Sequence, residues 1–310
     1  MATFNIAIIG ECMIELQEKD AQLNRTFGGD TLNTAVYLSR LTKDKDINTT
    51  YITALGTDNF SDEMMTAWNA EGIDTSKILR LENKHPGLYY IETDETGERS
   101  FHYWRNDAAA KYLLEQPESE ALLAGLMDFD AIYLSGISLA ILTEASREQL
   151  FSFLEAFSAK GGKVLFDNNY RPKLWEKKED AQAAYLRILS MTDIALLTFD
   201  DEQLLYGDET VEDCIARTQA AGVEEIAIKR GKEACLVVEQ DEHTFVPALV
   251  AKAVVDTTAA GDSFSGGYLA KRFTGGSAIQ AAHAGHQVAS TVIQYRGAVI
   301  PADVIPNIFA

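Results

Sequence analysis

The sequence predicts an α/β fold, in which one mostly parallel sheet carries helices on both faces. Strand-like runs rich in valine, isoleucine and leucine alternate with helix-like runs along most of the chain, which is typical of βαβ units. Several helix-like runs stop at a glycine, namely Gly72, Gly161 and Gly222, as helices commonly do. The 310 residues, 46% of them hydrophobic, are enough to bury a large core. We therefore expect one domain over residues 1–310.

Each expected strand is a short apolar or β-branched run, and each expected helix has apolar residues three and four apart. In chain order, the expected strands are 4–9, 51–55, 131–135, 163–167, 194–198 and 225–229. The expected helices are 31–41, 61–71, 143–160, 177–189, 211–221 and 277–293. Near the C-terminus, residues 254–256 indicate the end of another strand, followed by a helix that contains Phe264 and Phe273.

One segment breaks this alternation. Residues 88–93 and 98–105 flank the turn signal Asp94-Glu-Thr-Gly97, which predicts a β-hairpin. In the second arm, alternation places Phe101, Tyr103 and Arg105 on one face and His102 and Trp104 on the other. An arginine beside a tyrosine favours a polar ligand surface, so we expect an extra ribbon or a lid.

Composition and charge exclude several classes of protein. The formal net charge of -20 argues against nucleic acid or an anionic membrane as a partner. No apolar run approaches the roughly 20 residues of a membrane span, and residues 4–10 are too short for a signal peptide. Cys12, Cys214 and Cys235 are too scattered to predict a disulfide framework or a zinc site. We expect a cytoplasmic enzyme, with a soluble binding protein as the open alternative.

The most informative motif is the run from Val254 to Gly267. The small residues Ala259, Ala260 and Gly261 precede a helix, where free N–H groups favour an anion. Asp262 beside that site would repel a phosphate, but it is well placed to take a proton from a hydroxyl that attacks one. An ordinary N-cap aspartate in a tight turn explains the segment equally well.

Other familiar motifs are absent or weak. There is no P-loop, no G-x-G-x-x-G and no H-E-x-x-H, so the usual nucleotide-binding and zinc-hydrolase signatures are missing. Ser138 follows Gly136 as in a nucleophile elbow, but the second glycine is lacking, so a polar residue in a turn is the better interpretation. His283 and His286 lie three apart on an expected helix, without the acidic or cysteine partners that a metal would need.

Three short segments precede helices or follow strands, where open α/β sheets bind ligands. Gly28-Gly29 before the first helix allows close approach of a ligand, and Asn33 adds an amide one turn later. Arg171 follows the strand 163–167 and lies on the expected rim of the sheet. The acids of Phe199-Asp-Asp-Glu202 either hold Mg²⁺ through water or complement a helix dipole.

Together these segments resemble the ribokinase-type (PfkB) carbohydrate kinases, over essentially the whole chain. The two signatures occur in order, Gly28-Gly29 with Asn33 first and Asp256 to Asp262 later. The resemblance implies a ribokinase-like fold with a small β-sheet lid over the sugar, contributed here by about residues 12–27 and 80–106. It also implies ATP and Mg²⁺ as cofactors, and in some members K⁺.

The resemblance also implies roles for individual residues. Asp262 matches the general base, which we expect to be ionised because a helix N-terminus favours its anion. The backbone of Ala259, Ala260 and Gly261 matches the anion hole for the transferred phosphoryl group. Residues matching the sugar site are Gly28, Gly29, Asn33 and Asp262. Residues matching the ATP site are Asn169, Lys229, Gly231, Ala259, Ala260 and Gly261. Asp256 matches a monovalent-cation position, and Glu202 a position linked to Mg²⁺.

The chain departs from the family at two positions. Phe199 replaces the asparagine of the family's Asn-x-x-Glu element, which weakens the assignment of Glu202 to Mg²⁺. Glu15 stands where many relatives that bind neutral sugars have aspartate, and its extra methylene moves the carboxylate from the place of the usual contact with a sugar hydroxyl.

Within the family the sequence is most similar to the kinases of 2-keto-3-deoxygluconate. The residues that carry this likeness are Gly10–Glu15, Gly87–Tyr90, Tyr103–Arg105, Leu134–Ala140, Asp167–Arg171 and Gln294–Gly297. A sugar acid has a carboxylate, which arginine binds with paired hydrogen bonds. The resemblance thus makes Arg105, Arg171, Tyr89 and Tyr103 substrate contacts, with the tyrosines offering hydroxyls to the carboxylate or keto end.

We therefore expect ATP-dependent phosphorylation of 2-keto-3-deoxygluconate at its terminal hydroxyl. The alternatives are a fructokinase or ribokinase acting on a neutral sugar and, more remotely, a regulator that binds a sugar acid without turnover. Apolar residues on the outer face of the lid, such as Trp104, suggest that a second copy of the chain pairs there.

Overall fold

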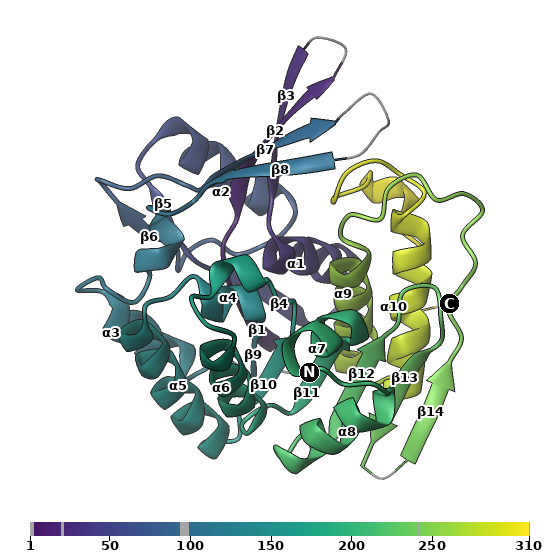
Figure 1. Ribbon diagram of the computed structural model, residues 1–310. Coiled ribbons are helices and arrows are strands. Elements are labelled where there is room, and N and C mark those ends of the chain that lie inside the picture. Colours follow the sequence, from purple (N-terminus) through teal and green to yellow (C-terminus); the bar gives the residue numbers. More distant parts are fainter. Residues whose placement is uncertain (1–2, 20–21, 94–98, 241, 310) are drawn as a thin grey trace.

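The main sheet has eight strands in the part of the chain that the computed structural model describes, residues 3–19, 22–93, 99–240 and 242–309 (Figure 1). Its strand order is β14-β13-β12-β11-β10-β9-β1-β4. The bounds are β1 (Phe4–Ile9), β4 (Ile47–Ile52), β9 (Ala131–Ser135), β10 (Lys163–Asp167), β11 (Ile194–Thr198), β12 (Glu225–Lys229), β13 (Cys235–Glu239) and β14 (Glu242–Val246). The strands from β12 to β4 are parallel, and β13 and β14 add an antiparallel edge.

Helices cover both faces of this sheet, as the sequence predicts (Figure 1). On one face lie α1 (Asp30–Leu41), α2 (Asn59–Ala70), α9 (Ala260–Phe273) and α10 (Ala278–Val292). On the other lie α3 (Ser119–Leu126), α4 (Gly136–Ala140), α5 (Glu144–Ala159), α6 (Lys178–Leu189), α7 (Phe199–Tyr206) and α8 (Val211–Ala220). Short 3₁₀ turns are η1 (Ala109–Tyr112), η2 (Pro172–Leu174) and η3 (Ala302–Val304).

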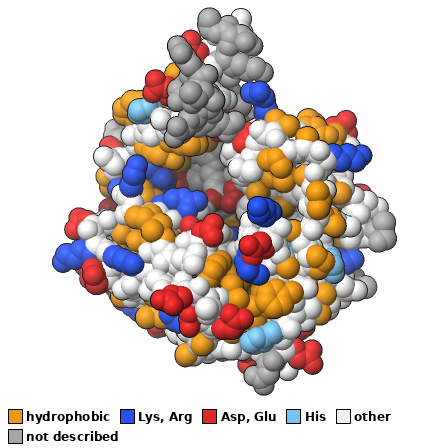
Figure 2. Space-filling view, turned by 45° about the vertical axis from the view of Figure 1, so that its right-hand side comes forward, with side chains coloured by type: hydrophobic (Ala, Val, Ile, Leu, Met, Phe, Trp, Pro, Cys, Tyr) orange, Lys and Arg blue, Asp and Glu red, His pale blue; other side chains and the backbone are white. Residues whose placement is uncertain are grey.

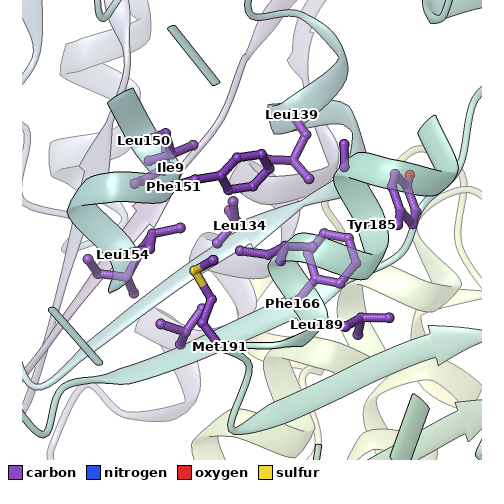
Figure 3. Packing of buried hydrophobic residues seen from close by; sticks show 14 of the residues in the cluster. Ile9, Leu134, Leu139, Leu150, Phe151, Leu154, Phe166, Tyr185, Leu189 and Met191 are labelled. Atoms are coloured by element: carbon purple, nitrogen blue, oxygen red, sulfur yellow. The ribbon is translucent and has the colours of Figure 1, made fainter. Parts of the chain in front are cut away.

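Side-chain alternation divides the core into two layers. Along β1, Ile6 and Ile8 pack on the α1 and α9 side, whereas Ala7 and Ile9 pack on the α5 and α6 side. Figure 3 shows the second layer, where Phe166 of β10 lies near side chains of α5 and α6. Because both faces are covered, the polar groups that are left for a ligand lie where strands end.

A second sheet of four strands stands apart from the main one. Its order is β3-β2-β7-β8, with bounds β3 (Gln22–Gly28), β2 (Met13–Lys19), β7 (Leu88–Thr93) and β8 (Arg99–Trp104). We call these four strands the small sheet. The turn predicted at 94–97 lies outside the described residues. Two further strands, β5 (Ala54–Gly56) and β6 (Leu79–Leu81), pair with each other. That residues 1–310 form one domain with the small sheet as its lid stays a prediction.

Two of the expected strands differ from the structure, and α3, β13 and β14 are not among the elements expected from the sequence. The strand end expected at 254–256 is wrong, because this segment belongs to the irregular connection between β14 and α9. Its N–H groups at Val255 and Asp256 instead donate to the carbonyl of Ile293, and Val254 is 65% exposed. The expected strand 51–55 covers the end of β4 and the start of β5, with Thr53 between them. No described helix is long and apolar enough to cross a membrane.

Candidate active site

A cavity of about 560 Å³ opens at the carboxyl ends of the parallel strands, between the starts of α1 and α9 and the small sheet. The face in Figure 2 is hollowed near its centre, with charged side chains around the hollow. The sequence-predicted residues that line the cavity are Gly28, Gly29, Asn33, Tyr89, Tyr103, Asn169, Arg171, Lys229, Gly231, Ala259, Ala260, Gly261 and Asp262. Segments far apart in the chain are thus brought to one place.

The N-terminus of α9 offers backbone donors to this cavity. Ala259 caps the helix in the left-handed conformation, with φ of 59°, which costs an alanine roughly 1–2 kcal/mol. Within the described residues the N–H groups of Ala259 and Gly261 have no hydrogen-bond partner, while that of Ala260 donates to Thr257 at 3.2 Å. Free donors at a positive helix end can bind an anion such as a phosphate.

Asp262 lies in the first turn of α9 and is held from α1. The amide Nδ2 of Asn33 donates to its Oδ2 at 2.8 Å, and the Thr34 hydroxyl donates to its carbonyl at 3.2 Å. Burial, followed by the charge of Asp30, raises the pKa of Asp262 to about 7, although Asn33 acts the other way. Burial thus acts against the ionisation of Asp262 that the helix end favours. A carboxylate with this pKa is suited to general-base work near neutral pH.

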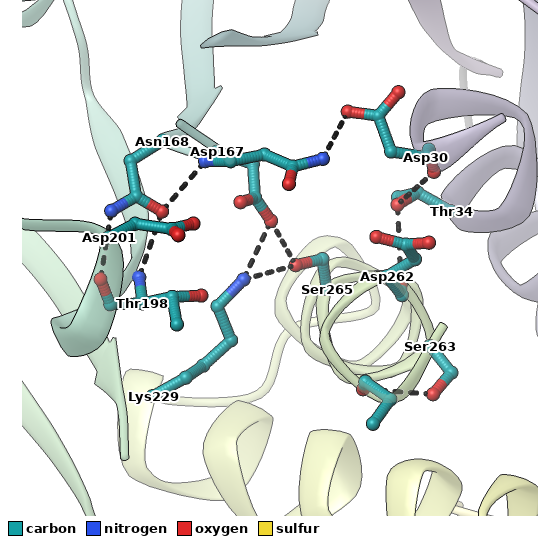
Figure 4. A network of polar contacts seen from close by, with 12 residues as sticks. Asp30, Thr34, Asp167, Asn168, Thr198, Asp201, Lys229, Asp262, Ser263 and Ser265 are labelled. Carbon is teal, nitrogen blue, oxygen red and sulfur yellow. Dashed lines mark hydrogen bonds and ion pairs between the residues drawn. The ribbon is translucent and has the colours of Figure 1, made fainter. Parts of the chain in front are cut away.

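A buried lysine lies close to the start of α9 (Figure 4). Lys229, at the end of β12, donates to Oδ2 of Asp167 at 2.7 Å, and Ser265 donates to the same oxygen at 2.8 Å. A Cβ placed on Gly261 would lie 3.7 Å from the Lys229 Nζ. The lysine therefore adds a fixed positive charge to the anion site.

Three further residues of the site, Asp30, Asp167 and Ser265, are not among those predicted from the sequence, whereas Asp201 is one of the acids of the Phe199–Glu202 segment. Asp30 and Asp201 line the cavity, and Asp167 and Ser265 hold Lys229. Asp30 also accepts from Asn169 at 2.6 Å, which ties the end of β10 to the start of α1. The sequence holds a signal for both acids, since Asp30 directly follows Gly28-Gly29 and Asp167 ends the expected strand 163–167.

The two predicted arginines lie in different surroundings. Arg171 lines the cavity with its side chain half exposed, 3.4 Å from Asp201. Arg105 is not among the cavity-lining residues; it forms an ion pair with Glu11, whose side chain is 1% exposed. Burial raises the pKa of Glu11, while Arg105 opposes that shift. The structure does not bring the two arginines together over one site.

Comparison with known proteins identifies the family. The model of the "pfkB family carbohydrate kinase" matches residues 3–305. The chain belongs to this family. A 2-dehydro-3-deoxygluconokinase of Dickeya dadantii is 60% identical over 99% of this chain and 100% of its own length. One from Escherichia coli K12 is 59% identical over 97% and 98%. A putative ribokinase II of E. coli, solved with ATP and Mg²⁺, has a TM-score of 0.80 at 23% identity, covering 95% and 94%.

In this pfkB family kinase, two predicted metal positions lie outside the cavity lining. Glu202 is 1% exposed, and its oxygens accept from Asn168 and Arg217, each at 2.8 Å. Arg217 also pairs with Asp208, so the positive charge beside the cluster of Glu202, Asp208 and Cys214 is supplied by an arginine side chain. This position does not favour the predicted contact of Glu202 with Mg²⁺.

Asp256 instead connects two loops of the kinase. Its Oδ1 accepts from the N–H and hydroxyl of Thr258, and its Oδ2 accepts from the N–H of Gly297 at 2.9 Å. Its assignment to a monovalent cation stays a prediction. Ser138 is a buried capping residue that donates to Ile9, which agrees with its interpretation as a polar turn residue.

Proposed function

We propose that this chain transfers the γ-phosphoryl group of ATP to the terminal hydroxyl of 2-keto-3-deoxygluconate, giving the 6-phosphate. The observation that carries the reaction type is Asp262 beside the donor groups that begin α9, in one cavity with Lys229. The substrate is supported by the names of the relatives at 59–60% identity, which match nearly the whole chain.

Asp262 acts as the general base in this proposal. It takes the proton of the terminal hydroxyl while that oxygen bonds to the γ-phosphorus and the bond to the β-phosphate oxygen breaks, releasing ADP. The N–H groups of Ala259 and Gly261, together with Lys229, stabilise the charge on the transferred group. Because these groups are fixed by α9 and β12, they need no reorganisation during the step.

The sugar acid is bound by residues on two sides of the cavity. Gly28, Gly29 and Asn33 approach it from the start of α1, and Arg171 supplies the charge for its carboxylate. Tyr103 adds a hydroxyl from the small sheet, which closes over the substrate and excludes water. Arg105 contributes only if its pairing with Glu11 leaves other guanidinium N–H groups available.

The cofactor sites follow from the lining of the same cavity. ATP lies along Asn169, Lys229, Gly231 and the start of α9. Carboxylates fit Mg²⁺, and Asp200 and Asp201 line the cavity whereas Glu202 does not, so the first two would hold the ion. When bound, Mg²⁺ would neutralise charge on the ATP phosphates.

Three further proposals concern the surroundings of the enzyme. We propose that K⁺ binds near Asp256 and that the enzyme is cytoplasmic. We also propose that two copies pair through the outer face of the small sheet, where Trp104 is 63% exposed.

The test is ATP-dependent ADP release with Mg²⁺, comparing 2-keto-3-deoxygluconate, gluconate, fructose and ribose at equal concentration. Strong turnover of the keto acid alone is expected. Turnover of fructose or ribose instead would keep the reaction type but discard the arginine argument. Binding of the keto acid without any ADP release would favour the regulator.

A further inference from the structure

Four side chains form one row across the small sheet. Glu15 of β2 is in register with Thr26 of β3 on one side and Tyr89 of β7 on the other, and Tyr89 is in register with Tyr103 of β8. Side chains in register share a face of a sheet. Because Tyr89 and Tyr103 line the cavity, this row faces the proposed sugar site.

Glu15 is occupied by its two neighbours in this row. The Tyr89 hydroxyl donates to its Oε2, and the Thr26 hydroxyl donates to its Oε1 at 3.0 Å. Glu15 itself does not line the cavity. The extra methylene that distinguishes glutamate from the aspartate of many relatives thus carries the carboxylate to a tyrosine rather than to the sugar.

This contact fixes the hydrogen-bonding role of Tyr89. A carboxylate only accepts hydrogen bonds, and a phenol has a single proton to give. Burial and the neighbouring Glu15 raise the pKa of Tyr89, so that proton is retained. With its proton directed to Glu15, the Tyr89 oxygen has only lone pairs left for a ligand.

The Tyr89 oxygen also lies at the substrate end of α1. A Cβ placed on Gly28 would come within 2.3 Å of it, so only a glycine leaves room for that hydroxyl beside the Gly28-Gly29 element. By contrast, the Tyr103 hydroxyl has no hydrogen-bond partner among the described residues, and Tyr103 is 52% exposed. Tyr103 is therefore free to donate to a carboxylate or keto oxygen.

We infer that Glu15 is a positioning residue for substrate selectivity, which makes Tyr89 an acceptor for a hydroxyl of the sugar and directs the substrate's carboxylate away from Tyr89. The inference rests on the proposed function and revises the expectation that both tyrosines offer hydroxyls to the carboxylate or keto end. A carboxylate placed at Tyr89 would meet an acceptor oxygen backed by a second carboxylate, and would be repelled.

A double-mutant cycle tests the inference, with Glu15→Gln, Tyr89→Phe and the double variant assayed on 2-keto-3-deoxygluconate. Glutamine keeps the size of glutamate but can also donate, so Tyr89 is no longer forced to act as an acceptor. We expect each single variant to raise KM roughly 5- to 30-fold with kcat nearly unchanged. The double variant should be no worse than Tyr89→Phe alone, because Glu15 acts only through Tyr89.

Thr26→Val is the matched control, since it removes the other hydrogen bond to the same carboxylate without touching Tyr89. It should leave KM within about 3-fold of the wild type. Fully additive losses in the cycle, or an unchanged KM in Glu15→Gln, would overturn the inference. If the wild type does not phosphorylate the keto acid, the proposed function fails instead. The cycle is then run on the sugar that is phosphorylated, where the same non-additivity is expected.

Discussion

The start of α9 and the small sheet contribute to one cavity, but they are built in different ways. At α9, four consecutive residues place an anion site and Asp262 on a single helix end. On the small sheet, Glu15 and Tyr89 are 74 positions apart in the chain and meet only through strand register. Groups for chemistry can thus be read from a contiguous motif, whereas groups for recognition depend on how distant strands pair.

The two regions also differ in burial and charge. Lys229 and Asp167 are buried in a network at the ends of the main sheet, and Asp262 beside them is partly buried, whereas Tyr103 and Phe101 of the small sheet are about half exposed. Fixed buried charges suit the stabilisation of a transition state, and exposed aromatic side chains suit binding. Substitutions near α9 should therefore change kcat, and substitutions on the small sheet should change KM.

The largest effect is expected for Asp262→Asn, which should lower kcat by roughly 10²–10⁴ because the base is lost. In the wild type, kcat/KM should fall as pH drops below about 7, since protonated Asp262 cannot take a proton. Steady-state kinetics from pH 5 to 9 measures both. Near-normal turnover in a folded Asn variant would remove Asp262 from the role and break the contrast between the regions.

Protein stability offers an independent check on the same residue. The folded chain holds the Asp262 proton up to about pH 7, whereas an unfolded aspartate loses it near pH 3.9. The folded state therefore binds more protons than the unfolded state between these two pH values. As pH rises through this range, the unfolding free energy of the wild type should decline. Asp262→Asn should lack this part of the decline in urea unfolding.

Arg105→Ala should chiefly lower stability, by about 3–5 kcal/mol, because it leaves Glu11 buried without its partner. The sequence alone predicts a loss of substrate binding instead, since the buried Glu11 beside Gly10 gives no sign of a distant partner. Urea unfolding measures the effect, and Arg105→Ala combined with Glu11→Gln should recover part of it. If Arg105→Ala keeps full stability but shows a large rise in KM for the keto acid, Arg105 would be a substrate contact after all.

Arg171→Ala should lower kcat/KM for the keto acid by about 10- to 100-fold, through loss of a charge-assisted hydrogen bond. The loss should be much smaller for a neutral sugar. Arg230→Ala is the matched control, because Arg230 lines the same cavity from the turn after β12 and should affect KM for ATP instead. Equal losses of Arg171→Ala on acid and neutral sugars would defeat the carboxylate argument.

The sequence predicts most of the fold because the signals there are local. Apolar runs and helix stops identify β1, β9, β10, β11 and β12, whereas 254–256 fails since two valines suit an exposed loop equally well. In the site, Asp262 and the start of α9 are found from one motif. The partners Glu11 and Arg217 are missed, because each pairs across a distance in sequence that no local pattern records.

The smallest effect is expected for Asp30, at the start of α1, because its negative charge acts on Asp262 at the start of α9. Asp30 lines the cavity, and its charge is the second cause, after burial, of the raised pKa of Asp262. Asp30→Asn removes that charge, so the pKa of Asp262 should fall. The acid limb of kcat/KM should then move to lower pH by about 1 unit.

The matched control is Asp128→Asn, which makes the same change in net charge at a side chain that is 87% exposed and away from the cavity. It should leave the acid limb where it is. If both variants shift the limb equally, the effect is one of net charge and not of the pair. If Asp30→Asn leaves the acid limb unchanged, the charge of Asp30 does not affect the pKa of Asp262. The raised pKa would then result from burial at the start of α9 and not from α1.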